Sequence, residues 1–61
     1  MDKNMIEISA TVIHETDMAI FIDDGDNEVW LPKSQLEDYP DVDETGIVTL
    51  PEWLAKDKEL I

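Results

Sequence analysis

The sequence contains no cysteine, no arginine and only two glycines among its 61 residues. Without cysteine there is neither the disulfide framework of small secreted domains nor a thiolate metal site. Gly25 and Gly46 lie too far apart in the chain to form a glycine-rich phosphate-binding loop. These absences exclude several catalytic and metal-binding classes, and they favour a reducing, cytoplasmic location.

Basic residues and long apolar runs are also scarce. Four lysines stand against 16 acidic residues, which gives a formal net charge of -12. Because nucleic-acid affinity depends on neutralising phosphates with cations, this charge predicts against direct nucleic-acid binding. It disfavours anionic membranes for the same reason, and no apolar run approaches the ~20 residues of a membrane-spanning helix. The charge either only keeps the protein in solution or steers it towards a basic surface on another protein.

The apolar pattern of the first half predicts three strands within a single small β-rich domain covering residues 1–61. Residues 5–15 alternate between apolar and polar side chains, with His14 on the apolar side at the end of the strand. Residues 18–22 are all apolar, which predicts a central strand buried on both faces. Asp-Gly and Asn residues then close a turn, and residues 28–31 return as the partner strand, which Pro32 ends.

The second half predicts a fourth strand and a helix. After a short helical turn with Leu36 in the core, an exposed acidic loop leads to a strand at residues 47–50. A capping box at residues 49–52 predicts a helix from about Pro51, with Trp53 facing the core. The expected fold is α+β and mainly β: a four-stranded antiparallel meander curled towards a small barrel, with a short turn after strand 3 and a C-terminal helix. The strands at residues 5–15 and 47–50 are expected at the sheet edges, where they could pair with a second copy in a homodimer.

Two features of the sequence bear on metals and catalysis. The oxygen-bearing side chains between Asp41 and Glu52 reproduce the spacing of a calcium-binding helix-loop-helix. The prolines beside this segment, and its better use as a core strand, favour an acidic loop without a metal. His14 is the only histidine, so neither a zinc site nor a nucleophile–base set is complete. We therefore expect no enzyme activity and no cofactor.

Acidic and aromatic residues supply the candidate binding surface. Phe21 is expected in the core, whereas Trp30 is either covered by the helix or exposed beside Lys33. Tyr39 is the aromatic residue expected to be exposed on the acidic loop, where it could anchor a partner. The candidate partner-binding residues are Asp23, Asp24, Asp26, Glu28, Glu37, Asp38, Tyr39, Asp41, Asp43 and Glu44.

The segments EVWLPKSQ at residues 28–35 and PEWLAK at residues 51–56 resemble those of short uncharacterised proteins encoded by bacteriophages and prophages. The resemblance implies a bacterial host cell. There, a non-enzymatic acidic module could mimic nucleic acid and inhibit a basic, nucleic-acid-handling host or defence protein, as anti-CRISPR and anti-restriction proteins do. The alternative is an accessory protein of phage DNA replication or recombination that touches single strands through Trp30, Tyr39 and Lys33.

Overall fold

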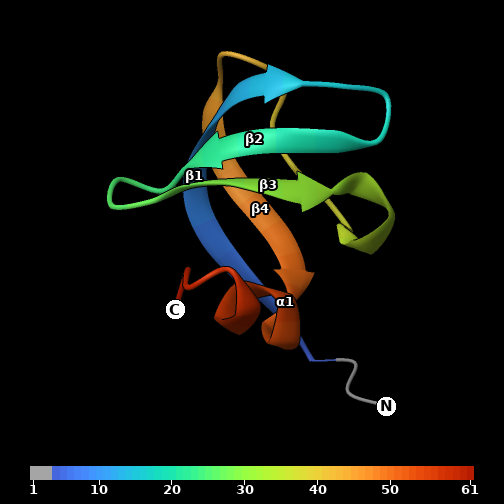
Figure 1. Cartoon of the computed structure of the whole chain (residues 1–61), viewed down its shortest axis with the longest axis vertical. Coiled ribbons are helices and arrows are strands. Elements are labelled where there is room, and N and C mark those ends of the chain that lie inside the picture. Colours follow the sequence, from blue (N-terminus) through green and yellow to red (C-terminus); the bar gives the residue numbers. More distant parts are fainter. Residues whose placement is uncertain (1–3) are drawn as a thin grey trace.

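The computed structural model describes residues 4–61 and confirms the predicted fold class (Figure 1). Four antiparallel strands form one strongly curled, unclosed sheet, and a short helix lies at one end of it. The elements in chain order are β1 (Met5–Glu15), β2 (Ala19–Asp23), β3 (Glu28–Pro32), the 3-10 turn η1 (Lys33–Gln35), β4 (Thr45–Pro51) and α1 (Glu52–Asp57).

The strand order in the sheet is β3-β2-β1-β4. The first three strands form the predicted meander. The whole of β4 then pairs with the first part of β1, from Met5 opposite Pro51 to Thr11 opposite Thr45. β1 is therefore an interior strand, and the expectation that it forms a sheet edge is wrong. The outer side of β4 is itself bridged by Asp38, whose carbonyl accepts from the Thr49 N–H at 2.9 Å.

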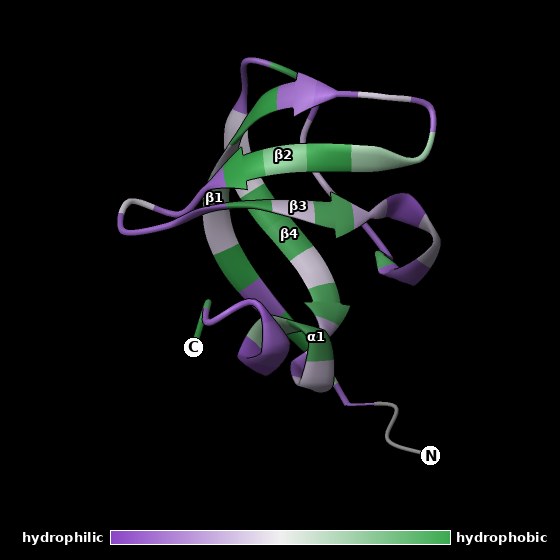
Figure 2. Cartoon of the chain, viewed as in Figure 1, coloured by the Kyte–Doolittle hydropathy of each residue, from purple (hydrophilic) through white to green (hydrophobic). Residues whose placement is uncertain are grey.

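The core lies on the inner face of the curl because alternate side chains of each strand point there. The predicted alternation of β1 is confirmed, with Ala10 and Val12 buried and the residues between them more open. β2 alternates as well, so the prediction that it is buried on both faces is wrong. The buried hydrophobic residues are Ala10, Val12, Ile20, Ile22, Leu31, Val48, Leu50, Leu54 and Ala55. Figure 2 shows these apolar stretches along the strands beside hydrophilic loops.

The predicted turn between β2 and β3 is a tight hairpin. Asp24 N–H donates to the Asn27 carbonyl at 3.1 Å, and Gly25 has a φ of 104°, which suits the first central position of a type II′ turn. The Asp24 carboxylate also accepts from the backbone N–H groups of Asp26 and Asn27. These hydrogen bonds lower the pKa of Asp24, because they stabilise the ionised carboxylate. The loop residues therefore fix the register of the two strands.

The predicted helix start near Pro51 is confirmed, but the capping box is wrong, and the short turn after β3 has no side-chain cap either. Ser34 lies inside η1, which begins after Pro32 without a side-chain cap. Thr49 lies within β4, and α1 begins after Pro51, also without a side-chain cap. Strand pairing takes Thr49, the residue that the capping box would need. Leu36 packs against the core as predicted.

The acidic segment between η1 and β4 is tied to the sheet at two places. Glu37 N–H donates to the Thr49 carbonyl at 2.9 Å, and Asp43 N–H donates to the Val12 carbonyl at 2.7 Å. Asp43 has a φ of 68°, which turns the chain into β4.

Within residues 4–61 no helix has the length and apolar character needed to cross a membrane.

Candidate functional site

Three aromatic rings lie in a row on the outer face of the sheet, one from each of β1, β2 and β3. Phe21 pairs with Trp30 across β2 and β3, and their ring centroids are 5.0 Å apart at 38°. His14 pairs with Phe21 across β1 and β2, with centroids 6.3 Å apart at 28°. We call His14, Phe21 and Trp30 the aromatic row. It places three aromatic rings outside the core, and Trp30 is 45% exposed.

The place of Phe21 and Trp30 follows from the hairpin turn. Hydrogen-bonded and non-hydrogen-bonded pairs alternate in an antiparallel ladder. Since Asp24 and Asn27 are hydrogen-bonded, Phe21 and Trp30 form a non-hydrogen-bonded pair, in which side chains approach most closely. Because Phe21 and Trp30 alternate with the buried Ile20, Ile22 and Leu31, both lie on the outer face, and the prediction that Phe21 lies in the core is wrong. Of the two settings considered for Trp30, the structure shows the exposed one.

A β-bulge brings His14 into the row. Val12 pairs with Ile22, but the next pair is His14 with Phe21, so Ile13 is an extra residue in β1. The extra residue shifts the alternation by one and turns the imidazole to the outer face. The prediction that His14 lies on the apolar side is wrong for this reason.

A polar row runs beside the aromatic row on the same face. The polar row crosses the sheet from β3 to β4, with one residue from each strand. These residues lie opposite one another in register: Glu28, Asp23, Thr11 and Thr45. The Thr11 and Thr45 hydroxyls bond each other at 2.6 Å, and the Asp23 carboxylate accepts from the Gly25 N–H at 2.8 Å. The outer face therefore combines stacking surface with hydrogen-bond acceptors.

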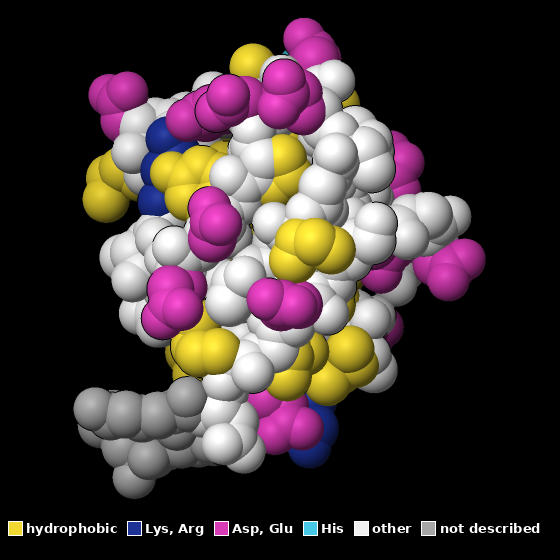
Figure 3. Space-filling view, turned by 180° about the vertical axis from the view of Figure 1, so that it is seen from behind, with side chains coloured by type: hydrophobic (Ala, Val, Ile, Leu, Met, Phe, Trp, Pro, Cys, Tyr) yellow, Lys and Arg dark blue, Asp and Glu magenta, His cyan; other side chains and the backbone are white. Residues whose placement is uncertain are grey.

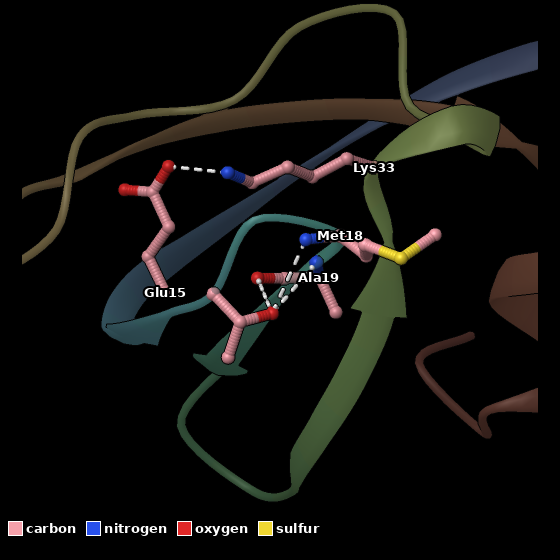
Figure 4. A network of polar contacts seen from close by, with 5 residues as sticks. Glu15, Met18, Ala19 and Lys33 are labelled. Carbon is pink, nitrogen blue, oxygen red and sulfur yellow. Dashed lines mark hydrogen bonds and ion pairs between the residues drawn. The ribbon is translucent and has the colours of Figure 1, made fainter.

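Lys33 follows the end of β3 and is already paired. Its ammonium group donates to the Glu15 carboxylate at 2.6 Å, which ties the end of β3 to the end of β1 (Figure 4). This hydrogen bond raises the pKa of Lys33, because it favours the charged ammonium. Lys33 N–H also donates to the Met18 carbonyl. The lysine thus has a structural role at this end of the sheet.

The predicted acidic residues occupy separate places. Asp23, Asp24, Asp26 and Glu28 lie at the β2–β3 hairpin, whereas Glu37 and Asp38 lie along β4, on the opposite edge of the sheet. Asp41, Asp43 and Glu44 precede β4 and lie beside β1. On the face shown in Figure 3, Asp and Glu side chains are scattered among neutral and apolar ones rather than gathered in one patch.

The segment between η1 and β4 contains two further predicted features, the Tyr39 anchor and the start of the calcium-like spacing. Tyr39 is half-buried and packs against the core, so the expectation of an exposed anchor is wrong. β4 separates the early and late members of the calcium-like spacing, since Thr45 begins the strand and Glu52 follows it. Among residues 4–61 no group of three or more His, Asp or Glu side chains is arranged to hold a metal ion.

Comparison with known protein families adds one finding. The model of a family described as S1 domain matches residues 7–50. The chain belongs to the S1 domain family. No curated protein and no solved structure matches the chain. S1 domains have an OB-like fold, and in OB folds the outer surface of strands 2 and 3 binds oligonucleotides. Phe21 and Trp30 lie on β2 and β3 of this sheet.

Membership in this family corrects the prediction made from charge. The S1 domain is a nucleic-acid-binding fold, which contradicts the expectation that direct nucleic-acid binding is unlikely. The expectation from net charge considered only the neutralisation of phosphates, whereas the stacking of bases on aromatic rings needs no cation. The aromatic row could have been found from sequence by counting outward from the Asp-Gly turn, which places Phe21 opposite Trp30.

Proposed function

We propose that this protein is a non-catalytic module that binds single-stranded nucleic acid on the aromatic row. The observation that carries the proposal is the contact between Phe21 and Trp30 on the outer face of β2 and β3. Unpaired bases stack on such rings, and each stacked base contributes about 1–3 kcal/mol. Membership in the S1 domain family supports nucleic-acid binding on the outer face of β2 and β3.

Stacking has to carry most of the affinity, because the chain has little positive charge to offer phosphates. Lys33 is paired with Glu15, and Lys56 lies on α1 near Glu52 at 3.9 Å. A duplex hides its base faces and presents its phosphates, whereas a single strand can turn its bases towards the protein. The surface therefore favours single strands over duplexes.

Tryptophan fluorescence tests the proposal directly, because Trp30 and Trp53 are similarly exposed, at 45% and 47%. The variant Trp53→Phe keeps only the tryptophan of the aromatic row, and Trp30→Phe keeps only the one on α1. Both are titrated with short single-stranded RNA and DNA and with a duplex of the same length. We expect single strands to quench the emission of Trp30 and to leave that of Trp53 unchanged.

The matched pair also supplies the control. Equal quenching of both tryptophans would indicate non-specific collisions, and quenching of Trp53 alone would place the ligand on α1. Either result contradicts the proposal, as does the absence of any signal at low salt with single strands.

The finer setting that we propose is an accessory role in bacteriophage DNA replication or recombination within the bacterial cytoplasm. It rests only on the resemblance of residues 28–35 and 51–56 to phage and prophage proteins. Release of the protein during infection and its recovery on single-stranded phage DNA after crosslinking would support this setting. Recovery only on host transcripts would contradict it and leave the binding activity in place.

A further inference from the structure

The acidic end of the polar row lies directly beside the exposed tryptophan. Glu28 precedes Trp30 by two residues in β3, and Asp23 follows Phe21 by two residues in β2. Residues two apart share one face of a strand, about 6.6 Å from each other along it. A base that stacks on the rings of Trp30 and Phe21 therefore has an edge directed at these carboxylates.

The two carboxylates form an unfavourable pair in the free protein. Asp23 and Glu28 are opposite each other in register, and the ladder makes them a non-hydrogen-bonded pair with closely spaced side chains. Like charges placed directly opposite destabilise a sheet. Within residues 4–61 no hydrogen bond or ion pair engages the Glu28 side chain, although Asp23 accepts from the Gly25 N–H. A ligand that donates hydrogen bonds to Glu28 would relieve this repulsion.

We propose that Glu28, with Asp23 beside it, makes this surface selective for guanine. This inference rests on the proposed function. An ionised carboxylate is only an acceptor, with two oxygens that can take a bidentate partner. The Watson–Crick edge of guanine carries two adjacent donors, N1–H and the N2 amine, which match such a pair of oxygens. Single-stranded bases are commonly recognised on that edge.

The other bases fit less well on the same chemistry. Adenine and cytosine each offer one amine beside a ring nitrogen acceptor. Uracil and thymine offer one N–H between two carbonyl oxygens, which an ionised carboxylate repels. The expected order of affinity is guanine, then cytosine and adenine, then uracil and thymine.

Fluorescence anisotropy with labelled pentanucleotides tests this selectivity. UUGUU and UUUUU are compared, together with a third strand in which inosine replaces guanine and removes only the N2 amine. We expect the wild-type protein to bind UUGUU about tenfold more tightly than UUUUU, as a bidentate contact allows. The inosine strand should lose most of that advantage.

Two variants with the same change of charge assign the effect. Glu28→Gln should abolish the preference for guanine, because an amide replaces one acceptor with a donor. Glu7→Gln, on the outer face of β1 opposite Thr49, should retain the preference. Thermal unfolding checks the fold: Glu28→Gln should melt at the same temperature as the wild type or higher, since it removes a like-charge pair.

Each outcome has a distinct meaning. Loss of the preference in Glu28→Gln alone supports the assignment. Equal wild-type affinity for UUGUU and UUUUU overturns the selectivity while leaving the proposed function intact, and so does a preference that survives Glu28→Gln. Failure of the wild-type protein to bind any of the three strands overturns the proposed function itself.

Discussion

The inner and outer faces of the β2–β3 hairpin both carry large apolar side chains, but the outer face also carries Asp23 and Glu28, and the two faces differ in burial. Ile22 on the inner face is fully buried, whereas its neighbour Phe21 is half-buried and contacts an exposed tryptophan. The inner face lowers the free energy of the folded state by leaving water. The outer face leaves apolar rings in solvent, which folding alone does not require. The comparison teaches that one strand can serve the core and the site with alternate residues.

The largest effect is expected on the inner face. Ile22→Ala should lower the free energy of unfolding by about 2–5 kcal/mol, because it removes buried methyl groups and leaves a cavity. A 61-residue domain has little stability to spare, so the variant should be largely unfolded at 37 °C. Urea denaturation followed by circular dichroism measures the change. Ile47→Ala, at a residue of β4 that is 50% exposed, is the control and should stay within about 0.5 kcal/mol of the wild type.

The next effect belongs to the outer face. Phe21→Ala should weaken single-strand binding by about 1–3 kcal/mol, roughly 5-fold to 150-fold, because it removes a stacking surface. Its fold should persist, and titration calorimetry beside a thermal melt separates the two effects. Trp53→Ala should bind like the wild type. If Phe21→Ala unfolded as readily as Ile22→Ala, the division between the two faces would be refuted.

A smaller effect on stability is expected at the turn that joins β2 and β3. The pKa of Asp24 is lowered in the folded state, so between its folded and unfolded pKa values the unfolded chain binds more protons. Its stabilising effect is therefore present above about pH 4 and is lost as the pH falls through the lowered pKa. Asp24→Asn should be less stable than the wild type by about 1 kcal/mol at pH 7. Melting curves at several pH values should show this difference shrinking below pH 4, and a constant difference would contradict the assignment.

The smallest effect is the dependence of binding on salt. Because stacking dominates and few cations meet phosphates, affinity should change less than about threefold between 50 and 200 mM salt. Screening of repulsion between the strand and a protein of net charge -12 acts in the opposite direction to counterion release. Anisotropy titrations over this range measure the slope. A steep fall in affinity would show that lysines, rather than the outer-face rings, hold the strand.

Features that depend on local pattern could be predicted from the sequence. Alternation in residues 5–15, the Asp-Gly turn and the stop at Pro32 predicted the strands and the hairpin correctly. Features that depend on pairing over long separations could not. The return of β4 to β1, the bridge from Asp38 to Thr49 and the half-burial of Tyr39 all arise from tertiary packing, which outweighs local propensity.

The predictions for the helix and for the site failed for related reasons. Trp53 follows an apolar pattern, but α1 is only six residues long and buries Leu54 and Ala55, so the tryptophan is left outside. The expectation against nucleic-acid binding was wrong because net charge sums the whole chain, whereas the proposed site depends on three rings from three strands. Only the register of the hairpin and the bulge in β1 bring those rings together.

The bulge at Ile13 therefore determines how far the aromatic row extends across the sheet. Were β1 to pair without this bulge, Ile13 would lie opposite Phe21, and ordinary two-residue periodicity would direct the imidazole inward and leave a platform of just two rings, Phe21 and Trp30. A strand of nucleic acid could then lie on two neighbouring β-strands but not reach a third. The footprint of the ligand, counted in nucleotides, would thus be set by an irregularity in the backbone and not by the identity of any side chain that touches a base.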